Sequence, residues 1–159
     1  MRILVISDSH GRRSAIERAI REQPTAEVII FLGDGADEAE DVKARLPKEK
    51  KMLSVRGNND WCCSAPDFDV LSLENAKIFF THGHLYDVKY DLYKVVCAAK
   101  SHNANILLFG HTHCPMVKYD DGLYLMNPGA LSHAWNGRPG YGIIDLTPSG
   151  FMLNTVELK

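Results

Sequence analysis

One stretch near the N-terminus, residues 3–10, has the sequence ILVISDSH. Its first four residues are apolar, and three of them are β-branched. Such a run is too short for a buried helix and is typical of a strand buried on both faces. Asp8 and His10 follow this strand directly. Ligands of open α/β sheets bind beyond the carboxyl ends of the strands, so this stretch predicts a parallel sheet with a polar site at its edge.

The same pattern of an apolar run and a polar end recurs along the chain. Further buried strands are expected at 28–32, 52–55, 78–80 and 106–109. Between them we expect three helices: one capped by Ser14 and ended by Pro24, one over 36–46 and one over 88–101. Turn sequences in the last third predict antiparallel strands at 115–119, 123–126, 141–146 and 151–157. We therefore predict one α/β domain over residues 1–159, parallel early and antiparallel late.

Composition limits the possible partners and locations of the protein. The formal net charge of −2 argues against a broad electrostatic grip on nucleic acid or on an anionic membrane. No apolar run reaches the roughly 18 to 20 residues that a membrane-spanning helix needs, and the N-terminal run is too short for a signal peptide. The four cysteines form no Cys-x-x-Cys pair and are expected to be reduced thiols. We expect a cytoplasmic protein that binds neither membrane nor long nucleic acid.

Every expected buried strand is followed by side chains that can bind a metal ion. They are Asp8 and His10, Asp34, Asn58 to Asp60, His82 and His84, and His111 and His113. Strands of one parallel sheet end at the same edge, so these side chains are expected to converge. The glycines at 33, 57, 83 and 110 permit the tight turns and close backbone approach that such convergence requires.

The donor atoms of this group favour particular metals. Two carboxylates, one carboxamide and four imidazoles suit Mn, Fe, Zn, Co or Ni better than Ca or Mg, which prefer oxygen alone. About seven ligands exceed what one tetrahedral ion uses, whereas two ions that share a bridging carboxylate would occupy them. Each short motif also has a simpler interpretation as a helix cap or a turn. A His-x-His pair within a strand would place both rings on one face.

Taken in order, these motifs resemble the calcineurin-like metallophosphoesterase superfamily, and within it the small YfcE-type phosphodiesterases and their retromer-subunit relatives. The resemblance extends from Asp8 to about Gly129. It implies a four-layer α/β sandwich in which helices flank two mixed β-sheets. It also implies that Asp34 bridges two metal ions. The first ion would bind Asp8, His10, Asp34 and His113, and the second would bind Asp34, Asn58, His82 and His111.

Two positions depart from the family pattern. Asn59 stands where many members carry a histidine that assists the leaving group, and Ala130 stands where the subgroup has a serine. Asn59 can donate a hydrogen bond to phosphate but cannot give up a proton. His84 is the remaining candidate for a proton donor; the alternative is that it only orients a ligand or binds phosphate. Asn59 and His84 are therefore the candidate catalytic and substrate-binding residues.

The resemblance implies hydrolysis of small phosphoesters, above all phosphodiesters, by a hydroxide that bridges two metal ions. Mn is the favoured cofactor, with Zn, Fe, Ni or Co as alternatives. Substrates with good leaving groups, such as aryl phosphodiesters, are expected to react better than alkyl monoesters. The alternative is a non-catalytic scaffold for protein interactions, like the retromer-subunit relatives. A homo-oligomer is left open. Two further histidines are assigned no ligand role: His102 is expected at a helix end and His133 in a loop.

Overall fold

The computed structural model describes residues 1–73, 75–133 and 137–159. Its strands form two five-stranded sheets, with the orders β10-β9-β1-β2-β3 and β4-β5-β6-β8-β7. The strands of the first sheet are β1 (Arg2–Ile6), β2 (Ala26–Phe31), β3 (Lys51–Ser54), β9 (Gly140–Thr147) and β10 (Gly150–Glu157). Those of the second are β4 (Phe68–Leu73), β5 (Ala76–Thr81), β6 (Ile106–Leu108), β7 (Met116–Asp120) and β8 (Leu123–Asn127).

Both sheets are mixed, as predicted. Strands β1, β2 and β3 are parallel, and β9 and β10 add antiparallel strands beyond β1. In the second sheet β5, β6 and β8 are parallel, and β4 and β7 are antiparallel edges. The antiparallel pairs predicted late in the chain are present as β7 with β8 and β9 with β10, and β8 also pairs in parallel with β6. Strand β4 was not predicted, because it has no fully buried residue and its apolar residues are interrupted by Asp69 and Ser72.

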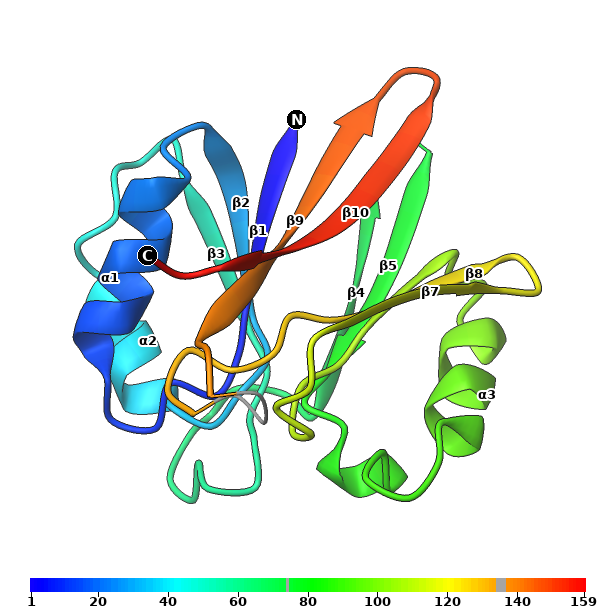
Figure 1. Ribbon diagram of the computed structural model, residues 1–159, viewed down its shortest axis with the longest axis horizontal. Helices are drawn as coiled ribbons and strands as arrows, with labels where there is room; N and C mark the ends of the chain where they lie inside the picture. Colours follow the sequence, from blue (N-terminus) through cyan, green and yellow to red (C-terminus); the bar gives the residue numbers. More distant parts are fainter. Residues whose placement is uncertain (74, 134–136) are drawn as a thin grey trace.

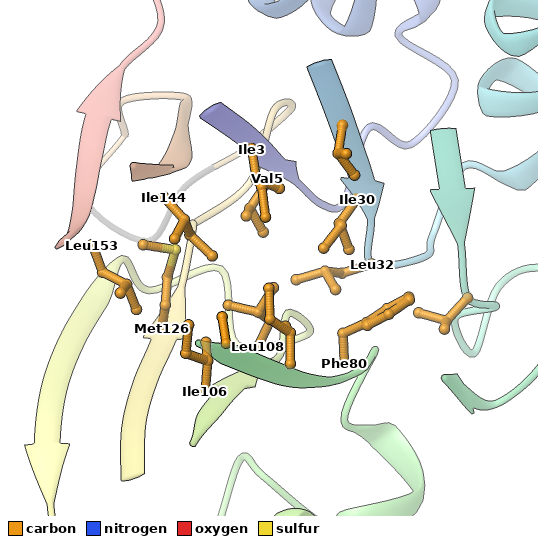
Figure 2. Packing of buried hydrophobic residues seen from close by; sticks show 14 residues of the cluster. Ile3, Val5, Ile30, Leu32, Phe80, Ile106, Leu108, Met126, Ile144 and Leu153 are labelled. Atoms are coloured by element: carbon orange, nitrogen blue, oxygen red, sulfur yellow. The ribbon is translucent and has the colours of Figure 1, made fainter. Parts of the chain in front are cut away.

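The core between the two sheets explains why the first strand is apolar throughout. Ile3 and Val5 point toward the other sheet, where Phe80 and Leu108 lie (Figure 2). Leu4 and Ile6 point the opposite way, because side chains of a strand alternate between its two faces. Each face of β1 is thus covered, which is the condition that a continuous β-branched run indicates.

The helices cover the outer faces of the sheets, which completes four layers (Figure 1). Helices α1 (Arg13–Glu22) and α2 (Ala36–Lys43) pack on the first sheet, and α3 (Tyr93–Ser101) packs on the second. The predicted cap at Ser14 is wrong: the cap position is Arg12, two residues earlier, and it makes no side-chain hydrogen bond to the helix. The third helix is also shorter than predicted. Among the described residues, no helix has the length and apolar character needed to span a membrane.

Candidate metal centre

The candidate site lies in the loops that follow β1, β2, β3, β5 and β6. Hydrogen bonds between backbone groups hold these loops together. Asp8 N donates to Gly33 O over 3.0 Å, and His10 N donates to Asp34 O over 3.0 Å. In the second sheet, Gly110 N donates to His82 O over 3.0 Å. The parallel strands therefore deliver their polar ends to one edge of the sandwich, as the sequence predicted.

Six of the seven expected ligands form two groups whose donor atoms lie within 4.8 Å of one another. We call Asp8, His10 and His113 the first cluster. In it, His113 Nε2 lies 3.0 Å from Asp8 Oδ1 and 3.4 Å from His10 Nε2. Asp8 is fully buried, whereas the His10 and His113 side chains are 31% and 27% exposed. The first cluster thus has a buried carboxylate on its inner side and two solvent-exposed histidines on its outer side.

The second cluster contains Asp34, His82 and His111 and lies deeper. His82 is fully buried and Asp34 is 3% exposed. His82 Nε2 lies 3.1 Å from His111 Nδ1 and 3.1 Å from Asn58 Oδ1, which brings in the seventh expected ligand. All seven side chains therefore converge, although they come from five separate loops.

Asp34 lies between the two clusters. Its Oδ2 is 3.6 Å from His82 Nε2 of the second cluster and 3.8 Å from His10 Nε2 of the first. Gly57 allows this carboxylate to sit against the next loop, since a Cβ atom at Gly57 would lie 2.1 Å from Asp34 Oδ1. The predicted need for close backbone approach at this glycine is confirmed.

Two imidazoles are oriented by backbone carbonyl groups. His82 Nδ1 lies 2.7 Å from Leu32 O, and His113 Nδ1 lies 2.7 Å from His133 O. A carbonyl oxygen only accepts, so Nδ1 must carry the hydrogen in both rings. Nε2 is then the atom that faces the cluster and is available to a metal ion. Histidine ligands in metal sites commonly have this second hydrogen bond.

The backbone of the site is unusual for residues with a side chain. Of the eight described non-glycine residues with positive φ, five are expected ligands: Asp8, His10, Asp34, His111 and His113. Such conformations are uncommon outside glycine and cluster at functional sites. The two His-x-His pairs lie beyond the ends of β5 and β6, where the sequence placed them, and not within a strand. Both pairs follow a strand, and the left-handed turn sends His111 to the second cluster and His113 to the first.

The electrostatics of the two clusters differ. Burial raises the pKa of the Asp8 carboxyl, but the hydrogen bond with His113 and the charge of His82 outweigh it, so the pKa lies below its ordinary value. The hydrogen bond to Asp8 in turn raises the pKa of His113. Burial and the neighbouring His82 lower the pKa of His111 to about 4. At neutral pH His111 is therefore an uncharged imidazole, the form that binds metal.

Asp60, one of the metal-binding side-chain types that follow the third strand, contacts backbone groups instead. Its Oδ2 accepts hydrogen bonds from the backbone N–H groups of Asp34 and Gly57, at 2.8 and 2.7 Å. Its Oδ1 accepts those of Gly35 and Ala36, both at 2.9 Å. These backbone donors lower the pKa of Asp60 although burial raises it. Asp60 thereby joins the loop after β3 to the loop that carries Asp34.

The two candidate catalytic residues occupy different places. Asn59 is bound to Asp34: its backbone N donates to Asp34 Oδ1 over 2.8 Å, and its Nδ2 donates to Asp34 Oδ2 over 2.6 Å. His84 begins a short 3-10 helix (His84–Tyr86), with its ring centroid 5.3 Å from that of His82. Its Nδ1 is buried without a partner among the described residues. Burial, followed by the charge of His82, lowers the pKa of His84.

The segment Asn127-Pro128-Gly129-Ala130 packs against the loop that carries His111 and His113. Asn127 is fully buried, and its Nδ2 donates to Gly110 O and Thr112 Oγ1 in the loop that carries His111 and His113. Ser132 Oγ donates to Asp8 O over 2.8 Å. Of the remaining histidines, His102 does follow α3, as expected. The His133 ring lies beside Arg12.

Comparisons with known proteins agree with this geometry. Residues 1–149 match the calcineurin-like phosphoesterase superfamily domain. Phosphodiesterase YfcE of Escherichia coli is 30% identical, over 91% of this chain and 88% of YfcE. The crystal structure of a predicted phosphoesterase from Streptococcus pneumoniae is also similar. It has a TM-score of 0.81 at 26% identity, over 98% of this chain and 88% of the other.

A third similarity concerns the fold alone. The zinc complex of Vps29 from Entamoeba histolytica has a TM-score of 0.76 at 21% identity, over the full length of both chains. The layered sandwich and its edge site define a metallophosphoesterase-type domain. The chain belongs to the calcineurin-like phosphoesterase superfamily.

Proposed function

We propose that this protein hydrolyses phosphodiesters and that its two clusters together hold two divalent metal ions. The observation that carries the proposal is the position of Asp34, whose Oδ2 lies within 3.8 Å of a histidine nitrogen from each cluster. A carboxylate in that position can bridge two ions. Membership of the superfamily supports phosphoester hydrolysis as the class of reaction.

The residues present fit such a pair of ions. One ion would be held by Asp8, His10, Asp34 and His113, and the other by Asp34, Asn58, His82 and His111. Oxygen and nitrogen donors without thiolate suit Mn, Zn, Fe, Ni or Co, and among these Mn is the ion that we propose. When bound, the two ions would supply Lewis-acid activation of water and of the phosphoryl oxygens.

Asn59 and His84 are proposed to contact the substrate. The Asn59 amide donates hydrogen bonds but has no proton to release to a leaving group. The lowered pKa of His84 keeps its ring largely uncharged at neutral pH, so it is also a poor proton donor there. The leaving group must then depart with little proton donation from these two side chains. We therefore propose small aryl phosphodiesters as better substrates than alkyl monoesters.

The test combines metal analysis with turnover. The metal-free protein is loaded with Mn, bound metal is counted by elemental analysis, and hydrolysis of bis(p-nitrophenyl) phosphate is followed. We expect about two ions per chain and hydrolysis that requires them. Asp8→Asn should reduce both, whereas Asp120→Asn, which changes an exposed carboxylate on β7, should change neither. Two bound ions without hydrolysis of any phosphoester would contradict the proposal.

A second candidate function is the protein-interaction scaffold. The similarity to Vps29 over the whole chain supports it. A scaffold would need the shared fold but not a catalytic site. The convergence of all seven expected ligands favours the enzyme. A cytoplasmic location is part of the proposal, and the four free cysteines are consistent with a reducing compartment. A homo-oligomer remains a prediction.

A further inference from the structure

A cavity of about 340 Å³ opens beside the first cluster and shares His10 with it. Its walls come from the loop after β1, the start of α2 and the loop after β3. It therefore lies where a group attached to phosphorus would extend from the proposed metal ions. The following inference rests on the proposed function and concerns which ester group the cavity accepts.

The charged side chains of this cavity are of one sign. Asp37, Glu38 and Asp60 line it, and the described lining residues include neither lysine nor arginine. Asp60 is fully engaged with backbone donors. Asp37 is exposed, and Glu38 is half-buried, with Oε1 accepting the Gly11 N–H. These two carboxylates give the cavity a negative potential, which repels an anionic ester group.

An aromatic surface completes the lining. Trp61 is 88% exposed, although it belongs to the cavity wall. The indole face attracts cations, and an aromatic ring beside carboxylates is a common way to bind a quaternary ammonium group. An exposed indole at the mouth of an acidic cavity is thus suited to a positively charged organic group.

The geometry points to a specificity pocket for a cationic ester group, formed by Trp61, Asp37 and Glu38. The substrate class is a phosphodiester of an amino alcohol, in which an ammonium group lies a few bonds from phosphorus. Such a diester is zwitterionic: its phosphate faces the metal centre while its ammonium group enters the acidic cavity.

The first experiment compares three p-nitrophenyl phosphodiesters whose second ester group is choline, ethanol or glycolic acid. All three release the same leaving group, so differences in kcat/KM report on the second group. We expect the choline ester to exceed the ethyl ester by at least about threefold, the size of one cation–π or exposed ion-pair contact, and the glycolate ester to be slowest. The Asp37→Asn/Glu38→Gln double variant and Trp61→Ala should reduce the choline-to-ethyl ratio toward one.

Glu40→Gln is the matched control. It removes a carboxylate from the same helix, outside this cavity, and should leave the ratio unchanged. Equal kcat/KM for the three diesters would overturn the pocket but leave the proposed function intact. Hydrolysis of none of them with Mn bound would instead remove the proposed function.

A second experiment needs no turnover. In a Trp135→Phe background, Trp61 is the one remaining tryptophan, so its fluorescence reports on the cavity. Choline should change this fluorescence at lower concentration than its neutral isostere 3,3-dimethylbutanol, and Asp37→Asn/Glu38→Gln should remove the difference. Equal responses to the two compounds in the parent protein would contradict recognition of the charge.

Discussion

The two clusters of the candidate metal centre contain similar ligands in different surroundings. In the first, Asp8 is buried but His10 and His113 are about a third exposed. In the second, Asp34 and His82 are almost completely buried. Burial removes water that would otherwise compete as a ligand, and it lowers the pKa of His111 in the second cluster. Under the proposed function, the second cluster would therefore hold its ion away from water, and the first would face solvent and substrate.

The comparison depends most strongly on Asp34, which belongs to both clusters under the proposed function. Asp34→Asn should lower the affinity for both ions and reduce kcat/KM by at least about 100-fold, since even outer-shell partners of ligands change metal affinity or activity by about 10- to 100-fold. Metal content and diester hydrolysis would be measured together. A variant that keeps two ions would show that Asp34 does not bridge them.

His82→Ala and His10→Ala separate the clusters. Replacing buried His82 leaves a cavity and removes the partner of Leu32 O, which should cost about 2 to 4 kcal/mol of unfolding free energy. His10 is exposed on one side, so His10→Ala should change stability by less than about 0.5 kcal/mol. Urea unfolding of both metal-free variants tests this difference. Equal loss of unfolding free energy in the two variants would contradict the difference in burial between His82 and His10.

Asp60→Asn tests how the second cluster is supported. An amide group turns at least one of the four backbone N–H donors into an unsatisfied group, which should cost about 2 kcal/mol. For a protein of this size, that corresponds to a fall in Tm of about 4 to 8 °C. Asp69→Asn on the exposed edge strand β4 is the control. An unchanged Tm for Asp60→Asn would mean that water replaces these hydrogen bonds.

The smallest expected effect is the change in unfolding free energy with pH. The unfolded chain protonates His111 near pH 6.5, while the folded, metal-free protein does so only near pH 4. His111 therefore costs stability as the pH falls from about 6.5 to 4. His113, whose pKa is raised, contributes stability below about pH 6.5 that is lost as the pH rises through its folded pKa.

Both contributions should be small, because solvent screens these partly exposed rings. His111→Ala should weaken the loss of stability in acid, and His113→Ala should deepen it. Unfolding free energies of the metal-free protein and both variants at pH 5 and pH 8 would show this. Identical pH dependence in the two variants would contradict the electrostatic difference between the clusters.

The fold was largely predictable where burial is complete. Strand β1 is covered by a sheet on one side and by helices on the other, so its residues 3–6 are all apolar. Strand β4 escaped prediction because it is a half-exposed edge, where apolar and polar residues mix. The end of a strand such as β5 was also predictable, because polar His82 interrupts the apolar run.

The pattern of strands with polar ends predicted the candidate site as a set of residues, and only the family resemblance assigned each residue to one of two ions. Ligand-type side chains at five strand ends indicated convergence, because parallel strands end at a common edge. Which ring joins which cluster depends on left-handed backbone turns at His111 and His113, which no local pattern of apolar residues indicates. The role of Asp60 was hidden for the same reason, since its partners are backbone groups of another loop.

The amino-acid sequence by itself determined the alternation of buried strands with polar ends, and hence the chemical types of the seven converging side chains. Tertiary structure alone decided the difference in burial between the clusters and the acidic cavity beside His10. The physical reason is that hydrophobic periodicity is a local property of the chain. Desolvation and potential at a point instead depend on groups from distant loops, which only the folded backbone brings together.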